Sequence, residues 1–418
     1  MVGTAVRQKS PPKLGRNGIL AVFGPGLVVM FADTDVGSVI TAAQSGVQWG
    51  YRLLLLQLLL VPILYVVQEL TVRLGIFTGK GHGELIRETL GSGWAWVSVC
   101  GLGIAAVGAL LTEFSGVAGI GELFGLPRAW SLSFVSAFLL LVVWTGSYRR
   151  VERVAILLGL FEFAFFGIAL GAHPSLAEIG SGIVRIPIAD KNYLYLVAAN
   201  IGAVIMPWMV FYQQSAVADK GLGPEHYFAA RIDTAVGALV TQLVMAAILI
   251  AAAATLGKAQ TTPSLNAVSD IAHALTPLLG VGLGKLVFSA GTLGAALVAA
   301  IVVSLAAAWG FGEVTGYKHS LEHRPLEAPW FYAVYTVAVI GGAILVLVVP
   351  DLVRLNIAVE VMNALLLPIV LGFLIALAIK ALPPTYRLRG WYLALTLFLA
   401  SVTAALGVYG GLTSLWSV

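Results

Sequence analysis

Two acidic residues stand close together inside the first long apolar stretch of the chain. Residues 31–38 (FADTDVGS) contain Asp33 and Asp35 beside hydroxyl and glycine residues. A charged side chain inside a bilayer costs at least about 2.5–3.5 kcal/mol, so each carboxylate needs a function or a partner. Asp, Thr and Gly also weaken a helix. We therefore expect the helix to break here, at Gly37, against a protein-lined or water-filled cavity. A structural kink whose aspartates meet neighbouring donors is the alternative.

A second interruption is expected in residues 200–208 (NIGAVIMPW). Pro207 lacks a backbone N–H and suits the first position of a new helix. The carbonyls of Gly202 and Ala203 then lose their helical donors and point into the interior. Carbonyls at helix C-termini carry partial negative charge. With the carboxylate of Asp35 and the thioether of Met206, they are suited to bind a cation.

The types of ligand atom narrow the choice of ion. Oxygen ligands alone suit Mg²⁺ or Ca²⁺. A thioether adds affinity for softer first-row ions such as Mn²⁺, Fe²⁺ or Co²⁺. A methionine is also an ordinary packing residue, but the position of Met206 at the break, next to Pro207, favours the ligand interpretation.

Composition shows what kind of protein must position these groups. Of 418 residues, 59% are hydrophobic and 11% charged, whereas soluble domains carry about 25% charged residues. The net charge of +4 is too small for a phosphate-binding surface. The single cysteine excludes a disulfide framework and a thiolate cluster. These values exclude a soluble enzyme, a disordered protein and a nucleic-acid-binding protein, and they indicate an integral membrane protein.

Apolar windows long enough to cross a bilayer occur eleven times, and none alternates with the period of a membrane barrel. The expected fold is all-α, with eleven transmembrane helices. The windows cover residues 19–47, 52–75, 94–126, 129–148, 154–172, 193–218, 235–257, 286–310, 328–349, 355–379 and 391–416. Short surface helices are expected over 79–90 and 258–276.

Positive residues set the expected orientation. Of the 24 Lys and Arg residues, 17 fall on the side of the N-terminus and 7 on the other side. The protein is expected in the cell (inner) membrane. Because cytoplasmic loops are richer in Lys and Arg, its N-terminus is expected in the cytoplasm and its C-terminus outside.

The two expected breaks lie in the first and sixth spans, which are the first spans of two five-span halves. Broken helices at matching positions are the signature of an inverted-repeat transporter. The expected organisation is a cytoplasmic tail (1–18), a first repeat (19–172), a second repeat (192–380) and an eleventh span with the C-terminus (390–418).

Several stretches resemble the Nramp family of divalent metal transporters, whose members have eleven or twelve spans and the leucine-transporter-like 5+5 inverted repeat with broken helices 1 and 6. Residues 35–38 (DVGS) stand where the family usually has Asp-Pro-Gly-Asn. The resemblance implies that Asp35, Met206 and the carbonyl of Ala203 bind the metal, together with Ser38 in place of the family's amide. The other matching stretches are 24–26 (GPG), 73–75 (RLG), 78–79 (TG), 206–207 (MP), and Glu113 with 124–127 (FGLP).

Two departures from the family pattern remove groups associated with proton movement. Trp208 replaces a histidine, and Leu110 replaces an aspartate. Histidine is the side chain that titrates near neutral pH, so proton coupling becomes doubtful.

Other acidic positions offer replacements for the lost groups. Asp33 has no acidic counterpart in the family motif, and Glu360 stands where relatives carry a glutamine. Each is expected to be an additional metal ligand or a partner of the ligands. The carbonyl of Gly202 has the same expected role. Glu360 and Glu113 are candidates for a proton or water route. Glu360 paired with a donor on a neighbouring helix is the alternative.

The expected function is secondary transport of Mn²⁺ or Fe²⁺ by alternating access. A Mg²⁺ transporter of the Nramp-related branch and a cation-coupled transporter of small organic solutes remain alternatives. No enzyme activity, cofactor or nucleic-acid partner is expected. The partners are the metal ion and the bilayer, and the protein is expected to be a monomer.

Overall fold

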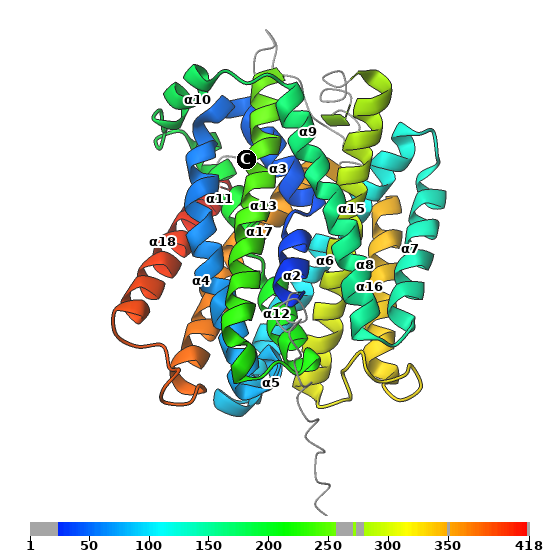
Figure 1. The fold of residues 1–418 in the computed structure, drawn as a ribbon, viewed down its shortest axis with the longest axis vertical. Coiled ribbons are helices and arrows are strands. Elements are labelled where there is room, and N and C mark those ends of the chain that lie inside the picture. The colour runs from blue at the N-terminus through cyan, green and yellow to red at the C-terminus, as the bar shows by residue number, and fades with distance from the viewer. Residues whose placement is uncertain (1–23, 256–270, 273–279, 349–351, 416–418) are drawn as a thin grey trace, which may run out of the picture.

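The computed structural model of the chain describes residues 24–255, 271–272, 280–348 and 352–415. Within these ranges all regular structure is helical, as the all-α prediction requires. Figure 1 shows α2 and α3 near the middle of the molecule, with α5 towards one end and α10 towards the other. The helices are α2 (Pro25–Asp33), α3 (Val36–Trp49), η1 (Gly50–Leu53), α4 (Leu54–Thr78), α5 (His82–Thr89), α6 (Ser92–Leu123), α7 (Arg128–Trp144), α8 (Tyr148–Gly159), η2 (Leu160–Phe163), α9 (Ala164–Gly171), α10 (Leu176–Ile183), α11 (Lys191–Gly202), α12 (Pro207–Lys220), η3 (Pro224–His226), α13 (Tyr227–Thr255), α15 (Val281–Thr315), α16 (Pro329–Val348), α17 (Leu352–Lys380) and α18 (Gly390–Leu415).

The described residues contain nine helical segments that are long and apolar enough to cross a membrane. α7, with 17 residues, is shorter. α2 is separate from the first of the nine segments, which runs through α3, η1 and α4. The described part of each of the eleven predicted windows is mostly helical, but the length criterion alone does not yield eleven spans.

The segment formed by α11 and α12 occupies the centre of the bundle. In its most apolar 18-residue stretch 94% of the residues are buried, whereas in α18 only 28% are. α13 packs against α2, α3 and α4, and α15 packs against α2, α6 and α12. The two interrupted helices therefore pack against long continuous helices, among them α13 and α15.

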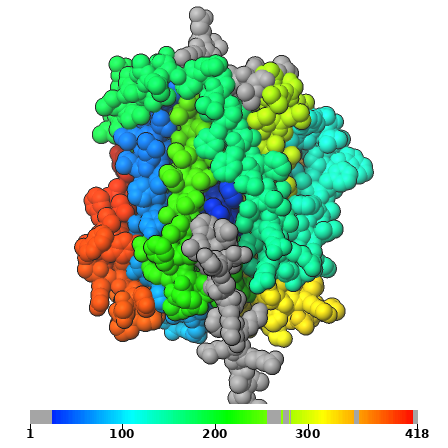
Figure 2. Space-filling model, in the orientation of Figure 1, coloured from blue at the N-terminus to red at the C-terminus, as the bar shows by residue number. Residues whose placement is uncertain are grey.

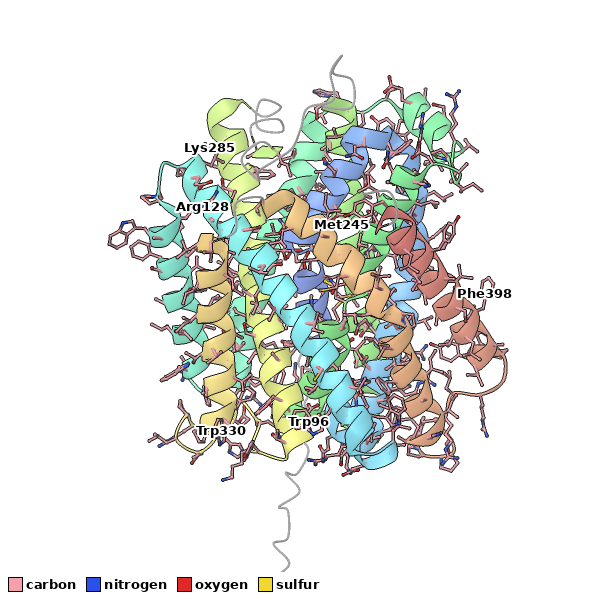
Figure 3. All side chains as sticks on the ribbon, turned by 180° about the vertical axis from the view of Figure 1, so that it is seen from behind. Trp96, Arg128, Met245, Lys285, Trp330 and Phe398 are labelled. Carbon is pink, nitrogen blue, oxygen red and sulfur yellow. The ribbon has the colours of Figure 1, made fainter. Side chains whose placement is uncertain are left out.

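The outer surface is apolar, as expected of helices that face lipid. Phe398 on α18 is 64% exposed. Figure 3 shows Trp96 and Trp330 near one end of the molecule and Arg128 and Lys285 near the other. Tryptophan and basic side chains at the ends of an apolar belt are typical of residues at membrane interfaces.

The short helix α5 confirms the surface helix predicted over 79–90. His82, its first residue, is buried, and its Nδ1 lies 2.8 Å from Oε1 of Gln214. Burial lowers the pKa of His82 to about 4, so this imidazole is neutral near pH 7. The predicted tail over 1–18 and nearly all of the helix predicted over 258–276 lie outside the described residues.

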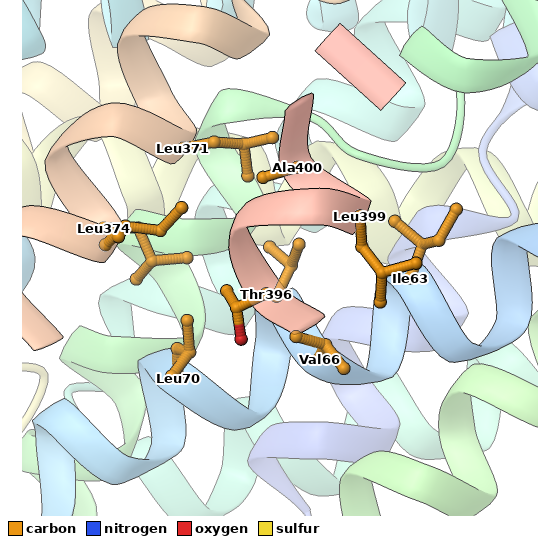
Figure 4. A pocket seen from close by; sticks show the side chains of 10 residues that line it. Ile63, Val66, Leu70, Leu371, Leu374, Thr396, Leu399 and Ala400 are labelled. Carbon is orange, nitrogen blue, oxygen red and sulfur yellow. The ribbon is translucent and has the colours of Figure 1, made fainter. Parts of the chain in front are cut away.

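One cavity lies at the side of the bundle and another at its end, near α5. One of about 10 Å³ lies between α4, α17 and α18 and is lined by ten residues, nine of them apolar, with Thr396 as the tenth (Figure 4). The other, of about 270 Å³, lies near α5 and is lined by polar residues that include Glu84, Asp219 and Glu313. Neither is lined by residues of the two helix breaks. On the face shown in Figure 2, a small dark-blue patch of the N-terminal segment is visible between the neighbouring helices.

Candidate metal site

The first broken helix is interrupted at Thr34 and Asp35, between α2 and α3. Asp35 has extended backbone angles (φ −69°, ψ 174°), and its Oδ1 accepts a 2.7 Å hydrogen bond from the backbone N–H of Ser38. This is an N-cap: a carboxylate next to the partial positive charge of a helix N-terminus. The prediction that the helix breaks at Gly37 was wrong, because Gly37 lies inside α3 and the helix is interrupted before it, at Thr34 and Asp35.

The second broken helix is interrupted between Gly202, the last residue of α11, and Pro207, the first of α12. Met206 precedes Pro207 with extended angles (φ −96°, ψ 142°) and is completely buried. A proline at the first helical position lacks only an N–H that would be unpaired in any case. Pro207 therefore starts α12 without loss of a helical hydrogen bond.

One hydrogen bond connects the two breaks directly. The hydroxyl of Ser38 donates to the carbonyl oxygen of Ala203 at 2.9 Å, and both residues are fully buried. Two predicted ligands from sequence positions 165 residues apart are thus adjacent. The other carboxylate oxygen of Asp35, Oδ2, has no hydrogen-bond partner among the described residues.

Glu360 on α17 lies against both broken helices. A Cβ at Gly37 would overlap Oε1 of Glu360, and a Cβ at Gly202 would overlap its carbonyl oxygen. Oε2 of Glu360 accepts a 3.1 Å hydrogen bond from Asn363, while Oε1 has no partner among the described residues. The site therefore buries two unpartnered carboxylate oxygens, one each from Asp35 and Glu360. Such oxygens are costly unless a cation or proton satisfies them.

Glu113 on α6 lies beside Asp35 but is occupied by protein donors. Its Oε2 accepts from the backbone N–H of Val36 at 3.3 Å, and its Oε1 accepts from the Thr112 hydroxyl at 3.0 Å. Asp33 is directed towards α13, where the Thr241 hydroxyl donates to its Oδ2 at 3.3 Å. Neither carboxylate shares a hydrogen bond with the Ser38–Ala203 pair.

The two departures from the family pattern leave apolar or uncharged groups in the interior. Trp208 follows Pro207 in α12 and is fully buried. Leu110 on α6 packs towards Gly342 of α16. Neither side chain can exchange a proton near neutral pH.

Within the described ranges, no three His, Cys, Asp or Glu side chains converge closely enough to hold a metal by themselves. A metal between the breaks would thus need carbonyl, hydroxyl or thioether ligands as well. Asn363 and Thr241 were not anticipated from the sequence. Asn363 follows Glu360 by three residues, and this helical spacing could have indicated that the two side chains are neighbours. No sequence spacing indicates the position of Thr241.

A sequence model of the family described as natural resistance-associated macrophage protein-like (Nramp) matches residues 26–413. The chain belongs to the Nramp family. The resemblance seen in the short motifs thus extends over almost the whole chain.

Named relatives of this Nramp chain are bacterial transporters. A protein from Erwinia tasmaniensis, named divalent metal cation transporter MntH, is 30% identical over 318 residues, which are 73% of this chain and 74% of that protein. The protein of the same name from Xanthomonas campestris is 31% identical over 69% of this chain and 67% of its own.

A solved structure shows the same fold. The crystal structure of the Eremococcus coleocola manganese transporter superposes with a TM-score of 0.80 at 18% identity, covering 99% of this chain and 90% of that one. This likeness establishes the fold of the Nramp chain described above.

Proposed function

We propose that this Nramp protein transports divalent metal cations across the cell membrane by alternating access. The observation that carries the proposal is the junction of the two broken helices, where Ser38 donates to Ala203 and Oδ2 of Asp35 has no partner among the described residues. Interrupted helices that meet at the centre of a bundle are typical of substrate sites in inverted-repeat transporters. The names of the MntH relatives support the same class of substrate.

The proposed ligands are the carboxylate of Asp35, the carbonyl of Ala203, the sulfur of Met206 and, directly or through water, the hydroxyl of Ser38. Glu360 is the proposed additional ligand or partner, because its unpartnered Oε1 faces Gly37 at the start of α3. Hydroxyl, carbonyl and carboxylate oxygens with one soft sulfur fit Mn²⁺ or Fe²⁺ better than Ca²⁺.

The proposed architecture has eleven crossings in two five-helix repeats, 19–172 and 192–380, followed by a last span over 390–418. α2 with α3 and α11 with α12 form the first crossing of each repeat, and the short α7 forms the fourth. The N-terminus is proposed to be cytoplasmic and the C-terminus outside. The proposed ligands are inaccessible to solvent in this conformation, so access must come from movement of the half-helices.

The test of this function is metal uptake by purified protein in proteoliposomes. Asp35→Ala removes the charged ligand and is expected to abolish Mn²⁺ uptake. Glu88→Gln, which changes a carboxylate in α5 whose partner is Lys80, is the matched control and should transport normally. Unchanged uptake by Asp35→Ala would refute the site.

Mg²⁺ is the second candidate substrate, because the added carboxylate of Glu360 and the amide lost at Ser38 move the site towards harder ions. Met206→Ala is expected to weaken Mn²⁺ and Cd²⁺ uptake at least about tenfold, equivalent to about 1.4 kcal/mol, and to leave Mg²⁺ uptake nearly unchanged. Met209→Ala, three residues later in the first turn of α12 and equally buried, is the control for lost packing. An equal loss for all three ions would show that the Met206 sulfur is not a ligand.

A further inference from the structure

Glu162 is a buried acid that the metal site does not use. It is fully buried in the fifth predicted span, and neither of its carboxylate oxygens has a hydrogen-bond partner among the described residues. No described Lys, Arg or His forms an ion pair with it. The nearby polar groups that act on it are the Thr34 side chain and the carboxylates of Asp33 and Asp35.

The helix that carries Glu162 is itself interrupted. The four residues of η2 form a 3-10 turn between α8 and α9, where the sequence predicted a continuous helix. Phe163 of η2 meets Phe31 of α2 edge to face, with ring centroids 6.3 Å apart. The irregular turn therefore lies against the last turn of α2, directly before the first helix break. A mid-helix 3-10 turn often marks a functional position.

Three further oxygen-bearing side chains surround this contact. Thr34 and Thr241 are hydrogen-bonded through their hydroxyl oxygens at 2.7 Å, and Thr241 donates to Oδ2 of Asp33. Oδ1 of Asp33 has no partner among the described residues. Asp33, Thr34, Glu162 and Thr241 are each at most 1% exposed. We call these four residues the α2–η2–α13 cluster.

The cluster also lies at the C-terminal end of α2. The last carbonyls of a helix have no intrahelical donors and carry partial negative charge. The cluster thus combines two carboxylates with a helix C-terminus. Among the described residues no positive side chain is paired with them, so protein groups do not balance this negative charge.

We propose that the α2–η2–α13 cluster is a second cation site, separate from the metal site, that binds a hard cation of the alkali or alkaline-earth class through oxygen atoms only. Asp33 and Glu162 supply the charged ligands, and Thr34 and Thr241 supply neutral oxygens. Carboxylate and hydroxyl oxygens without sulfur or imidazole select such ions over softer transition metals. A cation here would join α2 to η2 and α13, and so couple its binding to the position of the half-helix.

Ion-dependent thermal unfolding of the purified full-length protein tests this proposal. Choline chloride is replaced by NaCl, KCl, MgCl₂ or CaCl₂ at constant ionic strength, and the saturable rise in Tm is measured. At least one ion is expected to stabilise the wild type. Comparison of the four salts distinguishes the monovalent ions from the divalent ions. The same rise is expected in Asp35→Ala, which lacks the charged ligand of the metal site.

Variants of the cluster should behave differently. Glu162→Gln and Asp33→Asn are expected to lose the rise or to require at least about ten times more ion, which corresponds to about 1.4 kcal/mol of binding free energy. Glu122→Gln, a surface acid paired with Arg128, should keep it. If the charge variants do not fold, Thr241→Val removes one neutral oxygen with little change of shape and should weaken the ion response.

Three results would overturn the proposal. The first is a wild type with no saturable response to any of the four ions, in which case the carboxylates are held by protons. The second is a response that survives unchanged in Glu162→Gln and Asp33→Asn. The third is a response that disappears in Asp35→Ala, because the ion would then occupy the metal site. Loss of Mn²⁺ uptake in Asp35→Ala with a retained ion response would support both sites independently.

Discussion

At the scale of single residues, Glu360 is the group that most changes the character of the site. The resemblance places it where relatives carry an uncharged amide, and the structure brings it against Gly37 and Gly202, one from each broken helix. At the same time Trp208 and Leu110 occupy the positions of two titratable groups, and the buried His82 is neutral near pH 7. If the resemblance assigns these positions correctly, the site has one more acid than the family pattern and lacks two groups associated there with proton movement.

Proton coupling is therefore expected to be absent. Mn²⁺ uptake into proteoliposomes that contain a pH-sensitive dye should leave the lumenal pH unchanged, because neither Trp208 nor Leu110 can release a proton. Liposomes with the Asp35→Ala variant provide the background. A metal-driven proton flux that disappears in Glu360→Gln would contradict this expectation and would show that Glu360 is the carrier.

The sequence predicted those site residues that are unusual in their immediate sequence context. Asp35 is improbable in an apolar helix, and Met206 stands beside a proline, so both could be selected without a structure. Thr241 and the orientation of Asp33 towards it depend on the packing of α2 against α13, and no spacing along the chain encodes that contact. Glu162 lies inside the predicted span 154–172, but no spacing along the chain identifies its neighbours.

At the scale of elements, both helix breaks form where Asp, Thr, Gly and Pro weaken the helix, and this much the sequence predicted. The exact end of α2 was missed, because Asp35 caps α3 and so moves the break ahead of Gly37. The 3-10 turn in the fifth span was missed as well, since residues 160–163 (LFEF) contain no glycine or proline. Gly37 and Gly202 serve close packing: each allows α17 to approach a broken helix.

Substitution of Gly202 tests this packing role. Gly202→Ala would place a Cβ on the carbonyl of Glu360 and is expected to destabilise the protein by about 1–3 kcal/mol, as overpacking usually does. Gly167→Ala in α9 meets no neighbour within 4 Å and should be neutral or stabilising by about 0.5–1 kcal/mol, because alanine favours a helix. Thermal or denaturant unfolding in detergent measures both. Equal stability of the two variants would show that α11 and α17 are not packed as described.

A carboxylate from α13 holds the start of the first half-helix. Asp233 accepts hydrogen bonds from the backbone N–H groups of Gly24 at 3.2 Å, Gly26 at 2.8 Å and Leu27 at 3.3 Å. Asp233→Ala should cost about 0.5–2 kcal/mol, the usual range for loss of an N-cap side chain. Asp190→Ala, which removes the N-cap of α11 at the surface, is the comparison. No loss of stability in Asp233→Ala would mean that these N–H groups find other acceptors.

At the scale of the whole molecule, hydropathy fixes the membrane class but not the complete set of crossings. α7 is short, and the first crossing is divided by its break, so neither is recognised by length alone. The arrangement that matters is the central position of α11 and α12 in the bundle, which places the two breaks together and away from solvent. A closed junction with unpartnered carboxylate oxygens is consistent with a site that binds a cation and opens by movement of its half-helices.

Anomalous diffraction from crystals soaked with Mn²⁺ would test the central claim most directly. A single strong peak is predicted within bonding distance of the Asp35 carboxylate, the Ala203 carbonyl and the Met206 sulfur, and it should be absent from Asp35→Ala crystals. A wild-type peak elsewhere, with none between the two interrupted helices, would contradict the account.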